Sequence, residues 1–194
     1  MEWNKFADSV HRNAVEHGWW DEPRSFGEVA CLIHSELSEA LEEARAGRPM
    51  AYVVKGRDKA SFEESILYCE ENPDRWDGEK PEGIAVELCD AVIRVLDWFG
   101  YVGADFDVYF HESAFCDYGE EMKTIPFCDM LAEAHHRISL AYGFRDVMTR
   151  EHQLAAMVHI LVIWMEENDI QWESLMEKKH EYNKTRPYRH NKLF

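Results

Sequence analysis

The sequence predicts an all-α protein, an antiparallel helix bundle formed by one domain of 194 residues. Apolar residues recur three and four positions apart along five or six segments, as they do on one face of an α-helix. Glycine or proline follows most of these segments, and we find no convincing strand. A chain of this length is typical of a single domain and can bury a core without disulfides.

Six helical segments are expected in chain order, over about residues 4–17, 26–46, 81–99, 127–142, 150–167 and 172–185. Gly18 ends the first segment, and Ser25 stands before the second as an N-cap. Gly100 and Gly143 end the third and fourth segments, and Pro187 follows the last. The second and third segments carry the clearest apolar stripes, which are Val29, Leu32, Ile33, Leu37, Ala40 and Leu41, and Ile84, Leu88, Ala91, Val92, Val95 and Leu96.

Two stretches between these segments look irregular. Residues 48–80 are polar and contain too few apolar residues for a core, so we interpret them as an insertion or lid with a short helix over 62–70. Residues 111–126 form the second stretch. Residues 26–40 also resemble 127–141 in pattern, and 92–98 resemble 161–167, so 127–186 could be a second helical half that arose by duplication. The alternative is that any two amphipathic helices look alike.

Charge and cysteine usage exclude several functional classes. The net charge of −17 opposes binding to a nucleic-acid polymer, whereas clustered carboxylates suit hard cations. Five cysteines without CxxC spacing favour reduced core thiols in a cytoplasmic protein over a disulfide framework or a zinc site. No signal peptide is visible at the start of the sequence. The longest apolar run, 154–165, is broken by His159 and is too short to cross a membrane.

Two acidic pairs are the candidate metal ligands. Glu36, Glu39 and Glu43 share one face of the second segment, and Glu87 and Asp90 are three residues apart in the third. If these helices pack antiparallel, their carboxylates meet and repel one another unless a cation lies between them. Mg²⁺ prefers oxygen ligands and commonly bridges protein carboxylates to substrate phosphates. The alternative is that these are ordinary exposed glutamates, since ExxE alone is a weak signal.

The charge reverses sign near the C-terminus, where cations outnumber acids over 178–192. Lys179, Asn183 and Arg186 are spaced to lie on one helix face, which suits a triphosphate because arginine can bind phosphate through two nitrogens. Favourable placement of cations at a helix C-terminus explains the same pattern equally well.

Together these motifs resemble the MazG-type family of all-α nucleoside triphosphate pyrophosphatases, which includes the dimeric dUTPases and dCTPases. The family pattern of EExxE, ExxD and KxxxNxxR corresponds here to ELSE at 36–39, ELCD at 87–90 and KHEYNKTR at 179–186. The resemblance implies that Mg²⁺, or Mn²⁺ in its place, is bound by Glu36, Glu39, Glu87 and Asp90. It further implies that Lys179, Asn183 and Arg186 contact the triphosphate, and that water attacks the α-phosphorus to release a nucleoside monophosphate and pyrophosphate.

The resemblance also raises three expectations about the rest of the protein. Ser35 replaces the family's first glutamate, so Glu43, or less plausibly Glu42, would act as the general base. Trp19 would stack on the base and Trp20 is next to it, although core packing explains both residues as well. The chain would form a homodimer, or a pseudo-dimeric monomer if the duplication is real, and would act in nucleotide-pool housecleaning.

Two rival functions remain. A ferritin-like di-metal protein uses ExxH motifs, which occur at 133–136 and 177–180, although the second lies in the basic run where a buried iron site would be costly. A catalytically inactive nucleotide-binding module is the other, because Ser35 and the second half lack expected carboxylates.

Overall fold

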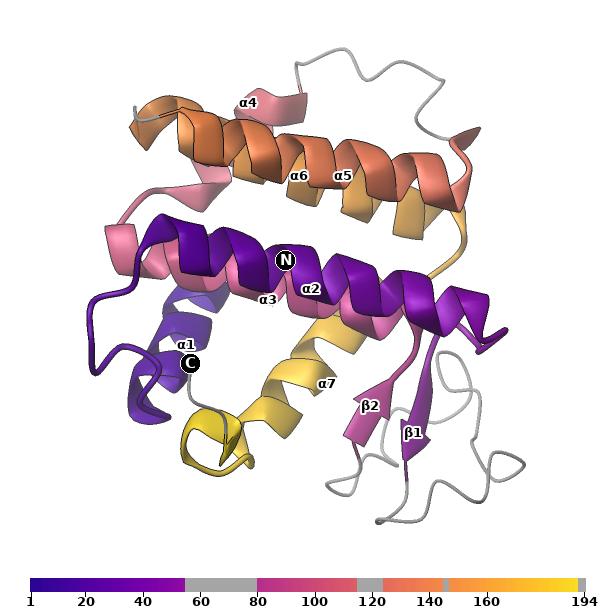
Figure 1. The fold of residues 1–194 in the computed structure, drawn as a ribbon, viewed down its shortest axis with the longest axis horizontal. Coiled ribbons are helices and arrows are strands. Elements are labelled where there is room, and N and C mark those ends of the chain that lie inside the picture. The colour runs from indigo at the N-terminus through magenta and orange to yellow at the C-terminus, as the bar shows by residue number, and fades with distance from the viewer. Residues whose placement is uncertain (55–79, 115–123, 145–146, 192–194) are drawn as a thin grey trace.

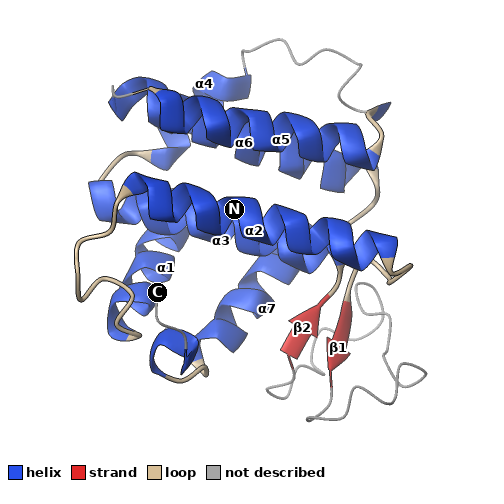
Figure 2. Cartoon of the chain, in the orientation of Figure 1, coloured by secondary structure: helices blue, strands red, loops and turns tan. Residues whose placement is uncertain are grey.

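The computed structural model describes residues 1–54, 80–114, 124–144 and 147–191, and these form a mostly helical bundle with one small sheet (Figure 2). The prediction of an all-α helix bundle is therefore confirmed. The helices are α1 (Trp3–Glu16), α2 (Phe26–Arg45), α3 (Ile84–Val102), α4 (Phe106–Ala114), α5 (Phe127–Gly143), α6 (Val147–Glu167), α7 (Trp172–Lys184) and the short 3₁₀ helix η4 (Tyr188–Asn191). The strands are β1 (Tyr52–Val54) and β2 (Lys80–Glu82).

The helices lie in three levels (Figure 1). In the middle level α2 and α3 run side by side in opposite directions, and α5 and α6 form a second antiparallel pair that packs against them. On the other side of α3 lie α1 and α7, which both contact it. This arrangement leaves one face of the α2–α3 pair to the second helix pair and the other face to α1 and α7.

Helix α3 is the central element of the core. Its residues are apolar on nearly all sides, and side chains such as Leu88, Val92 and Phe99 are completely buried. It contacts α1, α2, α6 and α7, so the core consists of a single cluster that extends from α1 to α7. The position of any polar side chain on α3 is therefore fixed by the helices that pack around it.

The small sheet and α4 differ from the sequence-based expectation. Tyr52, Val53 and Val54 pair antiparallel with Glu82, Pro81 and Lys80, so the prediction that the chain has no strand is wrong at both ends of the 48–80 stretch. Pro81 consequently belongs to β2, and α3 begins at Ile84 instead. Helix α4 ends at Ala114, within a region expected to be irregular from residue 111. The predicted short helix over 62–70 lies outside the described residues.

Among the described cysteines Cys89 is a buried core thiol, whereas Cys31 and Cys128 are exposed, so the expectation of core thiols is wrong for those two. Cys31, Cys89 and Cys128 are not joined in disulfides, and the other two cysteines lie outside the described residues. No described helix combines the length and the hydropathy that crossing a bilayer requires.

Ser25 begins α2 with a complete capping box. Its hydroxyl accepts a hydrogen bond from the Glu28 amide at 3.2 Å, and the Glu28 carboxylate accepts one from the Ser25 amide at 2.7 Å. This pairing satisfies amides that the first turn of a helix leaves without partners. The helix that carries Glu36 and Glu39 therefore starts at a defined residue.

We expect Ser25→Ala to lower the free energy of unfolding by about 1 kcal/mol, because the capping hydrogen bond is lost while the helix remains. Urea denaturation measures this change. Ser38→Ala is a matched control, since the exposed Ser38 hydroxyl only donates back to the His34 carbonyl within α2. Equal stability of the two variants would contradict a role for the cap.

Two histidines meet where α2 packs on α5. His34 Nδ1 and His135 Nδ1 are 2.7 Å apart, and the rings are stacked with centres separated by 5.0 Å. Burial lowers the pKa of both side chains, and His34 lowers that of His135 further. Only one proton can lie between the two nitrogens, so protonating both rings opposes the helix contact. His34 and His135 are therefore defined partners across the α2–α5 contact.

Acid is expected to destabilise the protein through this pair. Because both folded pKa values lie below the usual 6.5, the unfolded chain binds more protons, and stability is lost as the pH falls below about 6.5. The double variant His34→Gln/His135→Gln should therefore show a shallower decline in unfolding free energy between pH 7 and pH 5. Urea titrations across this range test it, and a slope identical to that of the wild type would disprove it.

Candidate active site

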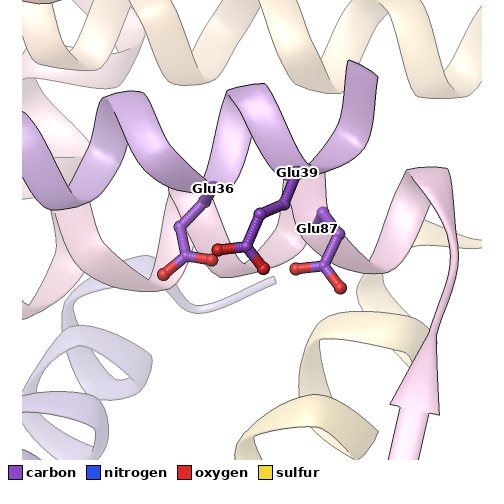
Figure 3. A group of neighbouring side chains, drawn as sticks. All are labelled: Glu36, Glu39 and Glu87. Atoms are coloured by element: carbon purple, nitrogen blue, oxygen red, sulfur yellow. The ribbon is translucent and has the colours of Figure 1, made fainter. Parts of the chain in front are cut away.

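Three carboxylates from two helices converge at one point of the middle level. Glu36 and Glu39 extend from α2, Glu87 extends from α3, and an oxygen of each lies within 4.8 Å of the others (Figure 3). Glu36 and Glu87 are buried, whereas Glu39 is exposed. The structure thus brings together three of the four residues predicted to bind metal, in the arrangement that antiparallel packing of two acidic helices predicts.

Burial and mutual repulsion make it unfavourable for these carboxylates to be ionised. The pKa of Glu87 is raised to about 8, chiefly by burial and also by Asp90, Glu36 and Glu39, although Lys179 opposes the increase. Burial likewise raises the pKa of Glu36, with Arg94 acting against this increase. Crowded carboxylates in a buried position gain most from a bound cation, because the cation relieves both desolvation and mutual repulsion.

Two cations already accompany the carboxylates. Arg94 Nε lies 3.1 Å from Glu36 Oε1, and Lys179 Nζ lies 2.7 Å from Asp90 Oδ2. If a bound cation keeps all four carboxylates ionised, these two cations leave two negative charges, which one divalent ion would neutralise. Carboxylate oxygens are also the ligands that Mg²⁺ prefers, so the residues present fit this metal.

Lys179 and Asp90 differ from their expected roles. The Lys179 side chain is only 2% exposed, and burial disfavours its charge, but attraction to Asp90 and Glu87 outweighs burial and raises its pKa. Its ammonium therefore pairs with the acidic residues of α3 and is not exposed to solvent, where a phosphate could bind it. Asp90 is beside the three converging carboxylates, yet one of its oxygens is taken by Lys179.

Gly83 sets the position of Glu87. It caps α3 with a positive φ of 119°, and a Cβ atom there would lie 2.7 Å from the Met50 carbonyl oxygen. The Ala85 amide donates to the same carbonyl at 2.8 Å. Only glycine allows this close approach, which fixes the first turn of α3 against the chain preceding β1.

A pocket joins these residues to α1 and α7. It encloses about 950 Å³ with its open mouth included. Its lining contains the four predicted metal ligands, Trp19, and the three predicted triphosphate contacts, which are Lys179, Asn183 and Arg186. Helix packing therefore gathers acidic, basic and aromatic candidates from distant parts of the sequence around one space.

Glu43 is the predicted site residue that the structure places elsewhere. Its carboxylate lies 2.8 Å from the Tyr52 hydroxyl and 3.2 Å from Arg48 Nη1, and Glu43 does not line the pocket. Although Glu43 shares a helix face with Glu39, the strand β1 supplies a partner that turns it away. The prediction that Glu43 is the general base therefore finds no support. Ser35 does line the pocket, but its hydroxyl donates to the Leu32 carbonyl at 2.9 Å.

Comparison with protein-family models, curated proteins and solved structures gave no match. The assignment of a chemistry to this pocket therefore depends on its own geometry.

The two tryptophans before α2 have different surroundings. Trp19 is 6% exposed and lines the pocket, with the Arg24 guanidinium 5.0 Å from its ring centre. Trp20 stacks on Tyr101 at 4.0 Å, and its indole nitrogen donates to Asp97 at 2.9 Å. Trp19 is therefore the one of the two that lines this pocket, while Trp20 packs against the core.

Two charged residues of α3 line the pocket and were missed from the sequence. Arg94 pairs with Glu36, and the buried Asp97 accepts from Trp20 and lies 2.8 Å from His11 Nδ1. Both continue the face of Glu87 and Asp90 at intervals of four and three residues. A polar stripe along an otherwise apolar helix was the signal that could have identified them.

The ExxH motifs do not form a metal site in the described part of the chain. The three converging glutamates are the one described group of at least three potential ligands. Glu133 instead pairs with Arg137 at 2.7 Å, and His180 Nε2 lies 2.9 Å from Ser9 Oγ. The geometry thus gives no support to the ferritin-like alternative.

Proposed function

We propose that this protein is a Mg²⁺-dependent nucleoside triphosphate pyrophosphohydrolase, which converts a nucleoside triphosphate and water to the monophosphate and pyrophosphate. The observation that carries the proposal is the convergence of Glu36, Glu39 and Glu87 at a pocket that Arg186 also lines. Acidic residues for a metal and a cation for phosphate are the two groups that phosphoryl chemistry requires most. The motif resemblance supports the same reaction.

In this proposal the carboxylates of α2 and α3 hold the metal. Glu36, Glu39 and Glu87 would be its ligands, with Asp90 beside them, and a bound Mg²⁺ would lower the pKa of a coordinated water and neutralise charge on the phosphates. Lys179 and Arg94 hold the acidic residues together in the absence of substrate. Arg186, which also lines the pocket, would bind a phosphate through two nitrogens.

Glu39 is the best candidate for activating the attacking water. It is the exposed member of the three glutamates, so water can reach it directly, whereas Glu36 is buried against Arg94. Glu43 and Glu42, the bases considered from the sequence, pair with Tyr52 and Arg45 instead. A base at this position would accept the proton as the water oxygen bonds to the α-phosphorus and the bond to pyrophosphate breaks.

The second helix pair, α5 and α6, supports a monomeric form of such an enzyme. It packs against α2 and α3 on the side away from the pocket-lining helices α1 and α7. It would therefore cover, within one chain, the surface that a partner subunit covers in dimeric members of the resembled family. Light scattering after gel filtration tests this, and a dimer in dilute solution would contradict it.

Product analysis tests the proposed reaction. The purified protein is incubated with Mg²⁺ and a panel of ribo- and deoxyribonucleoside triphosphates in isotopically labelled water. We expect pyrophosphate, not orthophosphate, with the label in the monophosphate because water attacks the α-phosphorus. Orthophosphate release or label in pyrophosphate would refute the mechanism, and nucleotide binding without turnover would favour the inactive nucleotide-binding module.

A further inference from the structure

Three buried polar atoms in the pocket wall have no hydrogen-bond partner among the described residues. They are Asn13 Oδ1 on α1, and His180 Nδ1 and Asn183 Oδ1 on α7. Buried polar groups in proteins are nearly always hydrogen-bonded, so each exception calls for an explanation. Three such atoms around one pocket are explained together by a ligand that completes their hydrogen bonds.

His180 is held rigidly with one nitrogen satisfied. Its side chain is 3% exposed, its ring meets the edge of Phe6 at 5.2 Å, and its Nε2 lies 2.9 Å from Ser9 Oγ. Burial, with a contribution from Lys184, lowers its pKa to about 4, so the ring is neutral at pH 7. When Nε2 carries the proton and donates it to Ser9, Nδ1 becomes an acceptor that only a hydrogen-bond donor can satisfy.

We propose that Asn13, His180 and Asn183 form a subsite that recognises an uncharged hydrogen-bond donor of the nucleoside, either a sugar hydroxyl or an amino group of the base. This inference rests on the proposed function, because the same pocket contains the carboxylates. Neutral amide and imidazole groups suit such a donor, whereas phosphates favour cations such as Arg186. Asn183 accordingly contributes to nucleoside recognition instead of contacting the triphosphate.

Binding measurements can distinguish the role of this subsite from that of the phosphate-binding residues. Calorimetry with Mg²⁺ compares non-hydrolysable α,β-methylene triphosphate analogues with inorganic tripolyphosphate. We expect His180→Phe, which keeps the ring but removes both nitrogens, to weaken analogue binding about five- to fifty-fold and to leave tripolyphosphate binding unchanged. Asn13→Ala should act in the same direction. His152→Phe, a matched change at an exposed position of α6, should affect neither ligand.

The choice of analogues identifies the donor. If the loss is confined to ribonucleotides and absent from 2′-deoxyribonucleotides, the donor is the 2′-hydroxyl. A loss with the cytidine analogue that is absent with the uridine analogue identifies an amino group. Equal weakening of tripolyphosphate and nucleotides in a variant with wild-type circular dichroism would overturn the subsite, as would unchanged nucleotide binding in both variants.

The binding experiment and the product analysis test the subsite and the enzymatic activity independently of each other. A subsite effect on analogue binding without any pyrophosphate release would retain the recognition role and refute the enzyme. Pyrophosphate release by a wild-type protein whose two variants bind nucleotides normally would retain the enzyme and refute the subsite.

Discussion

A Glu87→Gln variant is expected to lose at least about a hundred-fold in turnover while its metal-free fold becomes as stable as the wild type or more so at pH 7. The activity is lost because a neutral amide replaces a carboxylate of the converging group. The stability rises because the Glu87 pKa of about 8 exceeds the usual 4.5, so that stability declines as the pH rises from about 4.5 through 8. Glutamine removes the group that titrates over this interval.

Two measurements check this prediction. Pyrophosphate release gives the activity, and urea denaturation at pH 7 with and without Mg²⁺ gives the stability. Mg²⁺ should stabilise the wild type by binding only its folded form, and it should stabilise the variant less. Glu133→Gln, which breaks a partly exposed ion pair on α5, is the matched control and should retain activity. Full turnover in Glu87→Gln would remove this residue from the mechanism.

Replacing Lys179 by methionine is expected to lower the unfolding free energy by about 3–5 kcal/mol, the typical cost of leaving a buried charge without its partner. Lys179 Nζ lies 2.7 Å from Asp90 Oδ2, and the lysine side chain is almost completely buried. Without the ammonium, Asp90 and Glu87 face each other with no compensating charge from α7. Urea denaturation measures the change, and the loss should shrink when Mg²⁺ is present.

Two further variants make this result specific. Lys184→Met on the same helix removes an exposed ammonium that pairs with Glu181, and it should change stability by less than about 0.5 kcal/mol. Adding Asp90→Asn to Lys179→Met should restore part of the stability, because it removes the carboxylate that lost its partner. If both single lysine variants were equally stable, the buried ion pair would have no structural role.

The sequence was sufficient to predict features that depend on neighbouring residues. The stripes of α2 and α3 follow from helical periodicity, and the convergence of Glu36 and Glu39 with Glu87 follows from packing those two stripes antiparallel. The capping residue Ser25 was likewise visible as a local pattern. In each case the relevant contacts lie within one helix or between two helices whose buried faces were already defined.

Contacts between elements that are distant in the sequence could not be predicted from it. The spacing of Lys179 from Asn183 and Arg186 indicated a common helix face, but only the crossing of α7 over α3 shows that Lys179 meets Asp90. Glu43 has the same periodicity as Glu39, yet Tyr52 from a three-residue strand pairs with it. Such short strands carry little periodicity of their own and are defined by their partner.

The pairing of Val54 with Lys80 brings residues 54 and 80 next to each other across the sheet. Because β1 follows α2 and β2 precedes α3, the pairing of these strands links the two helices that carry the converging glutamates. A tight turn grafted between Val54 and Lys80 is expected to preserve this link, because antiparallel neighbours can be joined by a two-residue hairpin.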